Sequence, residues 1–141
     1  MDITAAMISL LAWLAVNTNY TIPTSERDLP IVEYRTPAEF QTTKGFGDVW
    51  ATYDPVTNVI HLRKPFDVSD PVYRSVLLHE LVHFLQTRNG KQSICRGFRE
   101  AEAYDLEFQW LKEQGFQKPL YDPFLVQQLK MDCMFPTDAT D

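Results

Sequence analysis

The stretch from Asp70 to Gly90 constrains the fold more than any other part of the chain, because all of its signals indicate one helix. Asp70 can accept hydrogen bonds from the free amides of a helix start, and Pro71 suits the first helical position, where a missing N–H costs nothing. Apolar side chains then recur near helical spacing, at Val72, Val76, Leu77, Leu81, Phe84 and Leu85. Asn89 and Gly90 provide a left-handed stop. The sequence therefore predicts a helix from about residue 70 to residue 88.

Within this helix, the run His79-Glu80-Leu81-Val82-His83 places two metal-binding side chains on one face. At about 100° per residue, positions four apart share a face, so both imidazoles can reach one ion while Glu80 leans toward the same side. The run predicts a metal site with a carboxylate beside it. A core helix that carries two surface histidines is the alternative. A third ligand from another element would decide between the two, because catalytic zinc usually takes three protein ligands.

A second predicted helix, residues 98–111, offers Glu100 and Glu102 as that third ligand. Two positions apart on a helix is about 200°, so the two carboxylates face nearly opposite ways. Glu102 falls on a polar, solvent-facing stripe with Asp105, Gln109 and Lys112. Glu100 projects on the side that looks buried, where a zinc ion would offset its desolvation, and it is the predicted ligand. Glu107 or Asp105 could hydrogen-bond a ligand imidazole from behind.

His79, Glu80, His83, Glu100 and Ala103 together resemble the gluzincin branch of the zincin metallopeptidases. In that branch, an HExxH helix is followed on a later helix by a glutamate in an ExxA-type setting. The resemblance covers about 35 residues directly, and the strand before the first helix more loosely. The Glu-x-Glu-Ala form also looks like that of small bacterial zincin-like domains of unassigned function.

The resemblance implies a zinc-dependent metallopeptidase, with His79, His83 and Glu100 holding Zn2+ and Glu80 as the general base. Zinc would lower the pKa of its bound water toward neutrality, and Glu80 would take a proton from that water as it attacks a peptide carbonyl. The implied partner is a peptide or protein substrate. The developing oxyanion normally needs a second electrophile. The available side chains are Tyr104, Tyr121, Arg96 and His61, and the sequence does not choose among them.

The predicted fold class is α+β, a minimal zincin-like domain over residues 1–141 in which the active-site and third-ligand helices pack with a small antiparallel hairpin or sheet. No linker, repeat or low-complexity run divides the chain. The other predicted elements are a helix over residues 3–16, a strand over 31–35, a short helix that starts with the capping box Thr36 to Glu39, a hairpin of residues 49–53 and 58–62, and a last helix from Asp122 to about Met131. By analogy with zincins, the hairpin edge could hold an extended peptide.

The segment over residues 3–16 is too short to span a membrane and lacks the positive region of a signal peptide, so a packed helix is expected. Cys95 and Cys133 could form a disulfide or remain free thiols. A disulfide indicates a periplasmic or secreted protein whose export signal was removed upstream, and free thiols would fit the cytoplasm. The disulfide is the prediction.

The charge of the chain argues against two classes of partner. The net charge is −6 and the 13 basic residues are scattered, so neither a nucleic acid nor an anionic membrane surface is expected to bind. The alternative to an enzyme is a non-catalytic domain in which zinc ties the helices together and the hairpin or an apolar groove binds a protein. Glu80 favours the enzyme, because a glutamate between the two histidines has no needed role in a purely structural zinc site.

Overall fold

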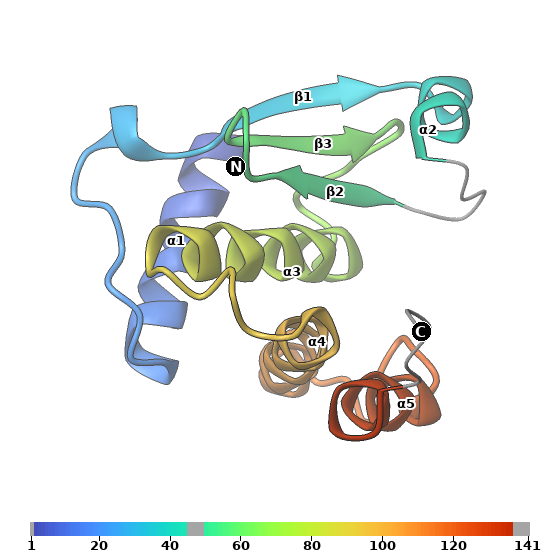
Figure 1. Ribbon diagram of the computed structural model, residues 1–141. Coiled ribbons are helices and arrows are strands. Elements are labelled where there is room, and N and C mark those ends of the chain that lie inside the picture. Colours follow the sequence, from blue (N-terminus) through green and yellow to red (C-terminus); the bar gives the residue numbers. More distant parts are fainter. Residues whose placement is uncertain (1, 45–49, 137–141) are drawn as a thin grey trace.

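Helices and strands alternate along the first half of the chain, and helices alone form the second half (Figure 1). The computed structural model describes residues 2–44 and 50–136. Its elements are α1 (Ile3–Asn17), the short 3-10 helix η1 (Glu26–Asp28), β1 (Ile31–Arg35), α2 (Pro37–Lys44), β2 (Ala51–Asp54), β3 (Val59–Arg63), α3 (Pro71–Arg88), α4 (Arg96–Glu113) and α5 (Pro123–Met134). The predicted α+β class is confirmed.

The sheet has the strand order β1-β3-β2, with β3 in the middle. β2 and β3 form the predicted antiparallel hairpin, although Val49, its first predicted residue, lies outside the described residues. β1 pairs with β3 in the parallel sense, so the sheet is mixed, where a small antiparallel sheet was expected. The chain between β1 and β3 contains α2 and β2, which is long enough for the crossover that a parallel pair requires.

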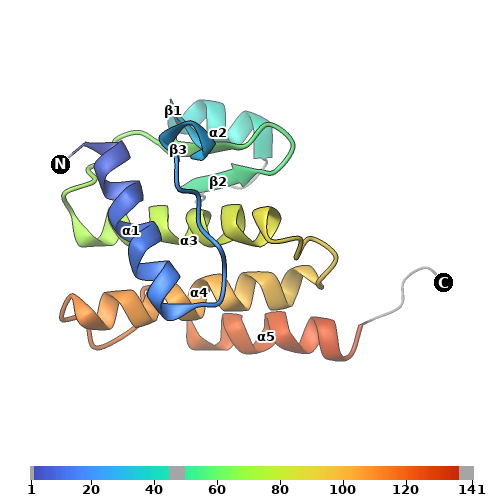
Figure 2. The ribbon, with the colours of Figure 1, turned by 90° about the vertical axis from the view of Figure 1, so that its left-hand side faces the viewer.

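α3 is the central helix, and its ends follow the predicted signals. The Asp70 carboxylate accepts a hydrogen bond from the Val72 amide at 2.9 Å, and Pro71 stands in the first turn. After Arg88, Gly90 adopts a positive φ of 71°, which favours glycine. The side chains of Leu77, Leu78, Leu81, Val82 and Leu85 have no exposed surface. α3 is buried on several sides because the sheet, α1 and α4 all pack around it (Figure 2).

α1 packs against α3 through a buried apolar stripe of Ala6, Met7, Leu10, Leu11 and Leu14. The expectation of a packed first helix is therefore confirmed. Within the described ranges, no helix combines the length and the apolar character that crossing a bilayer requires. One hydrophobic core joins α1, β2, β3, α3 and α4, so these elements form a single domain.

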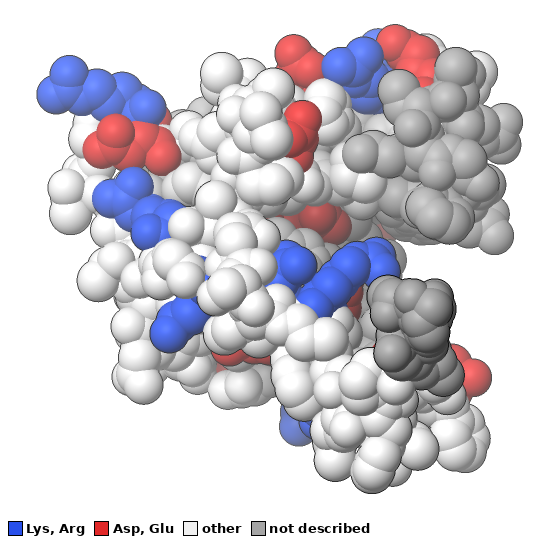
Figure 3. Space-filling view, in the orientation of Figure 1, with Lys and Arg blue, Asp and Glu red and all other residues white. Residues whose placement is uncertain are grey.

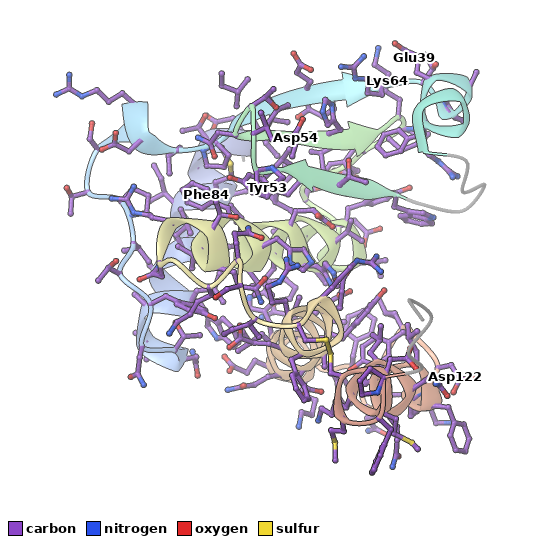
Figure 4. All side chains as sticks on the ribbon, in the orientation of Figure 1. Glu39, Tyr53, Asp54, Lys64, Phe84 and Asp122 are labelled. Atoms are coloured by element: carbon purple, nitrogen blue, oxygen red, sulfur yellow. A yellow bond between two sulfur atoms is a disulfide. The ribbon has the colours of Figure 1, made fainter. Side chains whose placement is uncertain are left out.

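The two sides of the core meet in aromatic contacts between the sheet and α3. The rings of Tyr53 on β2 and Phe84 on α3 lie edge to face, with centroids 6.1 Å apart (Figure 4). β2 is an edge strand, and this contact seats it directly over α3. β2 thereby forms one wall of a cleft over α3.

α5 lies on the outer side of α4 and is tied to it covalently. Asp122 caps α5 as predicted, but the helix runs on to Met134. Cys95, the residue before α4, forms a disulfide with Cys133 near the end of α5, so the predicted pairing is present (Figure 4). The helices approach so closely that a Cβ at Gly97 would collide with the backbone of Leu129. Disulfides form and persist in oxidising compartments.

Candidate metal centre

The three predicted ligands lie together where α4 crosses α3. Nε2 of His79 is 3.0 Å from Oε1 of Glu100, and Nε2 of His83 is 2.7 Å from the same oxygen. One ligand atom from each of the three residues lies within 4.8 Å of the others. His79 is buried, and His83 and Glu100 are partly exposed. The group could therefore hold a metal ion.

Glu107 holds the His79 imidazole from behind. Its Oε1 lies 2.9 Å from Nδ1 of His79, and its Oε2 lies 3.3 Å from the hydroxyl of Ser75. Of the two residues predicted for this role, Glu107 is therefore the one that contacts an imidazole. Asp105 is exposed, and its carboxylate lies 3.7 Å from the Lys130 ammonium on α5. The difference follows from helical phase, because Glu107 is two turns after Glu100 on the same face.

Gln86 holds the His83 imidazole in the same way, through an Oε1 that lies 2.9 Å from Nδ1. Gln86 is 1% exposed, and its Nε2 donates to Glu102 at 2.9 Å. Glu102 also accepts a hydrogen bond from the Tyr20 hydroxyl at 2.5 Å. The prediction that Glu102 is a solvent-facing residue is wrong, because the chain after α1 folds across this side of α4.

The pKa values of His79 and Glu100 show that this group favours a bound positive charge. Burial by itself would lower the pKa of His79, but hydrogen bonds to Glu100 and Glu107 outweigh it and raise the pKa to about 10. Burial would raise the pKa of Glu100, but hydrogen bonds from both histidines hold it well below its usual range. The raised pKa of His79 and the lowered pKa of Glu100 thus favour a proton held between these two side chains, and a metal ion bound by the same atoms could replace that proton. Two imidazole nitrogens and one carboxylate oxygen are a donor set of catalytic zinc, so the residues fit that ion.

Glu80 is buried beside this group, with 7% of its surface exposed. Burial raises the pKa of its carboxyl; His79 and His83 lower that pKa, and the charges of Glu100 and Glu107 raise it further. A raised pKa brings a carboxylate closer to the range in which it can accept and return a proton. Glu80, the residue expected to be the base, thus lies in the same cleft as His79 and His83.

The group opens into a cleft of about 730 Å³ between β2 on one side and α3 and α4 on the other. The cleft is lined by Trp50, Ala51, Thr52, Tyr53, Pro55, Val76, His79, Glu80, His83, Gln92, Arg96, Arg99, Glu100, Tyr104 and Glu107. In Figure 3, acidic atoms are visible inside the hollow between the sheet side and the helical side, with basic atoms at its margin. The predicted metal ligands thus face open space large enough for part of a polypeptide.

Comparison with known proteins places the chain in a family. A family model described as Domain of unknown function (DUF6647) matches residues 2–135. The chain belongs to this DUF6647 family. The matched stretch contains the three predicted ligands, Glu80 and the residues that support the two imidazoles. No curated protein and no solved structure matches the chain significantly.

Two of the four side chains considered for the oxyanion lie in the cleft of this DUF6647 domain. The Tyr104 ring stands 4.5 Å from the His79 ring, between centroids, and the Arg96 guanidinium lies 3.6 Å from Oε2 of Glu100. Tyr121 donates its hydroxyl hydrogen to the Tyr104 carbonyl at 3.1 Å. His61 lies on β3, where its Nδ1 accepts a hydrogen bond from Arg35. Tyr121 and His61 are therefore committed elsewhere.

Sequence reasoning did not assign Gln86 or Tyr20 to the candidate site, and it placed Glu102 on a solvent-facing stripe. Gln86 follows His83 by three residues, a spacing at which two helical side chains are neighbours, and this signal could have identified it. Tyr20 is far from α4 in sequence, and nothing local indicates its contact with Glu102. The residues around the ligands are thus only partly readable from helix periodicity.

Proposed function

We propose that this domain is a zinc-dependent hydrolase, specifically a metallopeptidase that cleaves peptide bonds with Glu80 as its general base. The observation that carries the proposal is the convergence of the His79 and His83 Nε2 atoms on Glu100, with a buried carboxylate beside them in an open cleft. A purely structural zinc site more often uses four protein ligands, many of them cysteines. Here both cysteines are joined in a disulfide.

In this proposal, His79, His83 and Glu100 would hold the zinc ion. When bound, zinc would supply a Lewis acid that polarises a carbonyl and lowers the pKa of water. Glu107 and Gln86 keep the two imidazoles pointed at the ion through hydrogen bonds to Nδ1. The ligands are therefore oriented before any ion arrives.

Glu80 would accept a proton from the attacking water and then deliver it to the leaving amine. Its burial raises the pKa of the carboxyl, which suits a group that must both accept and return a proton. Tyr104 would be the second electrophile, because it lines the cleft next to His79. Burial, and next the charge of Glu100, raise the Tyr104 pKa to about 12, so the hydroxyl remains a hydrogen-bond donor at neutral pH.

The substrate would be a peptide or protein segment in extended form. β2 is an edge strand and contributes Ala51, Thr52 and Tyr53 to the cleft wall. An extended chain can add to such an edge through main-chain hydrogen bonds. The Cys95–Cys133 disulfide supports a periplasmic or secreted location for this activity.

A second candidate is a non-catalytic, zinc-stabilised domain that binds another protein. One observation favours it: the outer face of α5 is apolar and exposed, with Phe124 77% and Phe135 68% exposed and Met131 between them. Large exposed apolar side chains on one helix face are typical of binding surfaces. The open metal cleft and Glu80 favour the peptidase, and an activity assay separates the two.

The deciding experiment compares wild type with Glu80→Gln in the zinc-loaded state. Both proteins should bind about one zinc per chain, but only wild type should hydrolyse unfolded protein or a mixed peptide library. Glu113→Gln is a suitable control. Glu113, at the far end of α4, accepts a hydrogen bond from Trp13 on α1 and lies outside the cleft. Turnover that survives in Glu80→Gln would remove Glu80 as the base, and zinc binding without turnover in wild type would favour the binding domain.

A further inference from the structure

The side chains behind His83 form a chain of hydrogen bonds that we call the Gln86 relay, made of Gln86, Glu102 and Tyr20. Oε1 of Gln86 is hydrogen-bonded to Nδ1 of His83, and Nε2 of Gln86 donates to the Glu102 carboxylate. The Glu102 carboxylate also accepts a hydrogen bond from the Tyr20 hydroxyl. We propose that Gln86 is a positioning residue that, held by Glu102 and Tyr20, keeps the His83 proton on Nδ1 and leaves Nε2 free for the metal ion. This inference rests on the proposed metal site.

The acceptors around Gln86 decide which way its amide faces. The Nε2 group lies 2.9 Å from the Arg99 carbonyl oxygen and 2.9 Å from the Glu102 carboxylate. Both partners only accept hydrogen bonds, so the two hydrogens of the amide must point at them. A flipped amide would set an oxygen against two oxygens in a site where Gln86 is 1% exposed. The Gln86 oxygen therefore faces His83.

The direction of the amide in turn assigns the tautomer of His83. An amide oxygen cannot donate, so Nδ1 must carry the hydrogen of the 2.9 Å contact. In a neutral imidazole, the other nitrogen then has the free lone pair. That nitrogen is Nε2, which lies 2.7 Å from Glu100 in the metal group. The relay thus selects the nitrogen that faces the site.

The far end of the relay is anchored to a different part of the chain. Tyr20 follows α1, and the next residue, Thr21, exchanges hydrogen bonds with Asn89 at the end of α3 at distances of 2.9 to 3.1 Å. Glu102 stands on α4, so the relay joins α3, α4 and the segment after α1. Three independently positioned elements therefore fix the Gln86 amide, and a rotation of Gln86 would break several hydrogen bonds at once.

The relay differs from the support of the other histidine. His79 meets the Glu107 carboxylate directly, whereas a neutral amide separates His83 from the Glu102 carboxylate. In both cases Nε2 of the histidine lies next to Glu100. Only His79 has a carboxylate in direct contact with its Nδ1. A carboxylate at position 86 could orient His83 in this way only if Glu102 lost its charge.

The first test measures Zn2+ affinity by chelator competition in wild type, Gln86→Leu and Gln109→Leu. Gln86→Leu should weaken zinc binding by about 10–100-fold, as loss of a residue that orients a ligand does. Gln109→Leu is the matched control, because Gln109 also links α4 to another element, through Asn17, but touches no histidine. It should bind zinc as wild type does. Equal zinc affinity in all three proteins overturns the relay, whereas no zinc binding in wild type overturns the metal site itself.

A charge exchange keeps the inference testable if Gln86→Leu does not fold. Gln86→Glu alone sets two carboxylates against each other and should weaken zinc binding. Adding Glu102→Gln restores the contact between positions 86 and 102, since the new amide can donate to the new carboxylate while its oxygen accepts from Tyr20. The Arg99 carbonyl, which accepts from the Gln86 amide in wild type, still faces a carboxylate oxygen, so the double variant should recover only part of the lost affinity. Gln86→Glu with wild-type affinity, or a double variant no better than Gln86→Glu, contradicts the relay.

A spectroscopic readout separates orientation from general stability. In the Co2+-loaded protein, each imidazole bound through Nε2 carries an Nδ1 hydrogen whose exchange with solvent can be followed by paramagnetic NMR. The His83 signal should be slowly exchanging in wild type and Gln109→Leu, and exchange faster in Gln86→Leu and Tyr20→Phe. An unchanged His83 signal in Gln86→Leu would show that Gln86 does not hold this hydrogen.

Discussion

At the scale of single residues, the candidate site is defined by where each carboxylate stands relative to the two imidazoles. Glu100 faces both Nε2 atoms, Glu107 faces Nδ1 of His79, and Glu102 reaches His83 only through Gln86. Glu100 and Glu102 are two positions apart on α4, so their carboxylates project in different directions and contact different partners. Substituting each in turn therefore gives different expected results.

Glu100→Gln should abolish stoichiometric zinc binding, whereas Glu102→Gln should retain it. The Glu100 carboxylate is within 3.0 Å of both imidazole nitrogens, and an amide is a poorer zinc ligand. A glutamine at position 102 can still accept from Tyr20 and Gln86 through its oxygen. Metal analysis of the purified, dialysed proteins gives the answer. Zinc retained in Glu100→Gln and lost in Glu102→Gln would reverse the ligand assignment.

Tyr104→Phe should lower kcat by about 10- to 1000-fold and leave zinc affinity close to that of wild type, since loss of one oxyanion donor acts mainly on the transition state. The ring contacts with His79 and Tyr121 need no hydroxyl and should survive. Steady-state kinetics on the best peptide of a library, with parallel zinc titration, measures both effects. A matched control is Tyr34→Phe, on β1 outside the cleft. If kcat is unchanged in Tyr104→Phe, the oxyanion donor is another group.

At the scale of elements, the metal group depends on how α4 is held against its neighbours. Glu100 is in the second turn of α4, and Cys95, which forms the disulfide to α5, is the residue just before this helix begins. Gly97 lies between Cys95 and Glu100 and packs so near the Leu129 backbone that a Cβ there would collide with it. The α4–α5 crossing thus supports the part of α4 that brings the third ligand.

Cys95→Ser with Cys133→Ser should lower the free energy of unfolding by about 2–4 kcal/mol, because the disulfide closes a loop of 38 residues and restricts the unfolded chain. Urea unfolding followed by circular dichroism, with and without reductant, measures the change. Reductant should destabilise wild type and leave the double serine variant unaffected. A wild type that unfolds at the same urea concentration in both conditions would mean that the disulfide contributes no stability.

At the scale of the whole molecule, stability and metal binding are coupled through the same buried charges. After chelation, a protonated His79 would lie between Glu100 and Glu107, where hydrogen bonds raise its pKa from 6.5 to about 10. A pKa that is higher in the folded than in the unfolded state stabilises the fold fully below pH 6.5, and this stabilisation is lost as the pH rises through about 10. Zinc takes the place of the protons, so it should remove this dependence.

The chelated protein should therefore become less stable between pH 6.5 and about 10, whereas the zinc-loaded protein should change much less over the same range. Urea unfolding at a series of pH values, in chelator and in excess zinc, measures both curves. His79→Gln in chelator should flatten the slope, because the titrating imidazole is gone. A chelated wild type that gains stability with rising pH would contradict a raised His79 pKa.

The sequence by itself determined those features that depend on one helix at a time. Asp70 and Pro71 define the start of α3, and helical phase selects Glu100 over Glu102, because these signals lie within a few turns of the residues they describe. The tertiary structure decided the parallel pairing of β1, the choice of Glu107 over Asp105, and the contact between Tyr20 and Glu102. These features depend on how separate elements cross, and a crossing is determined by packing across the whole core, which no local pattern encodes.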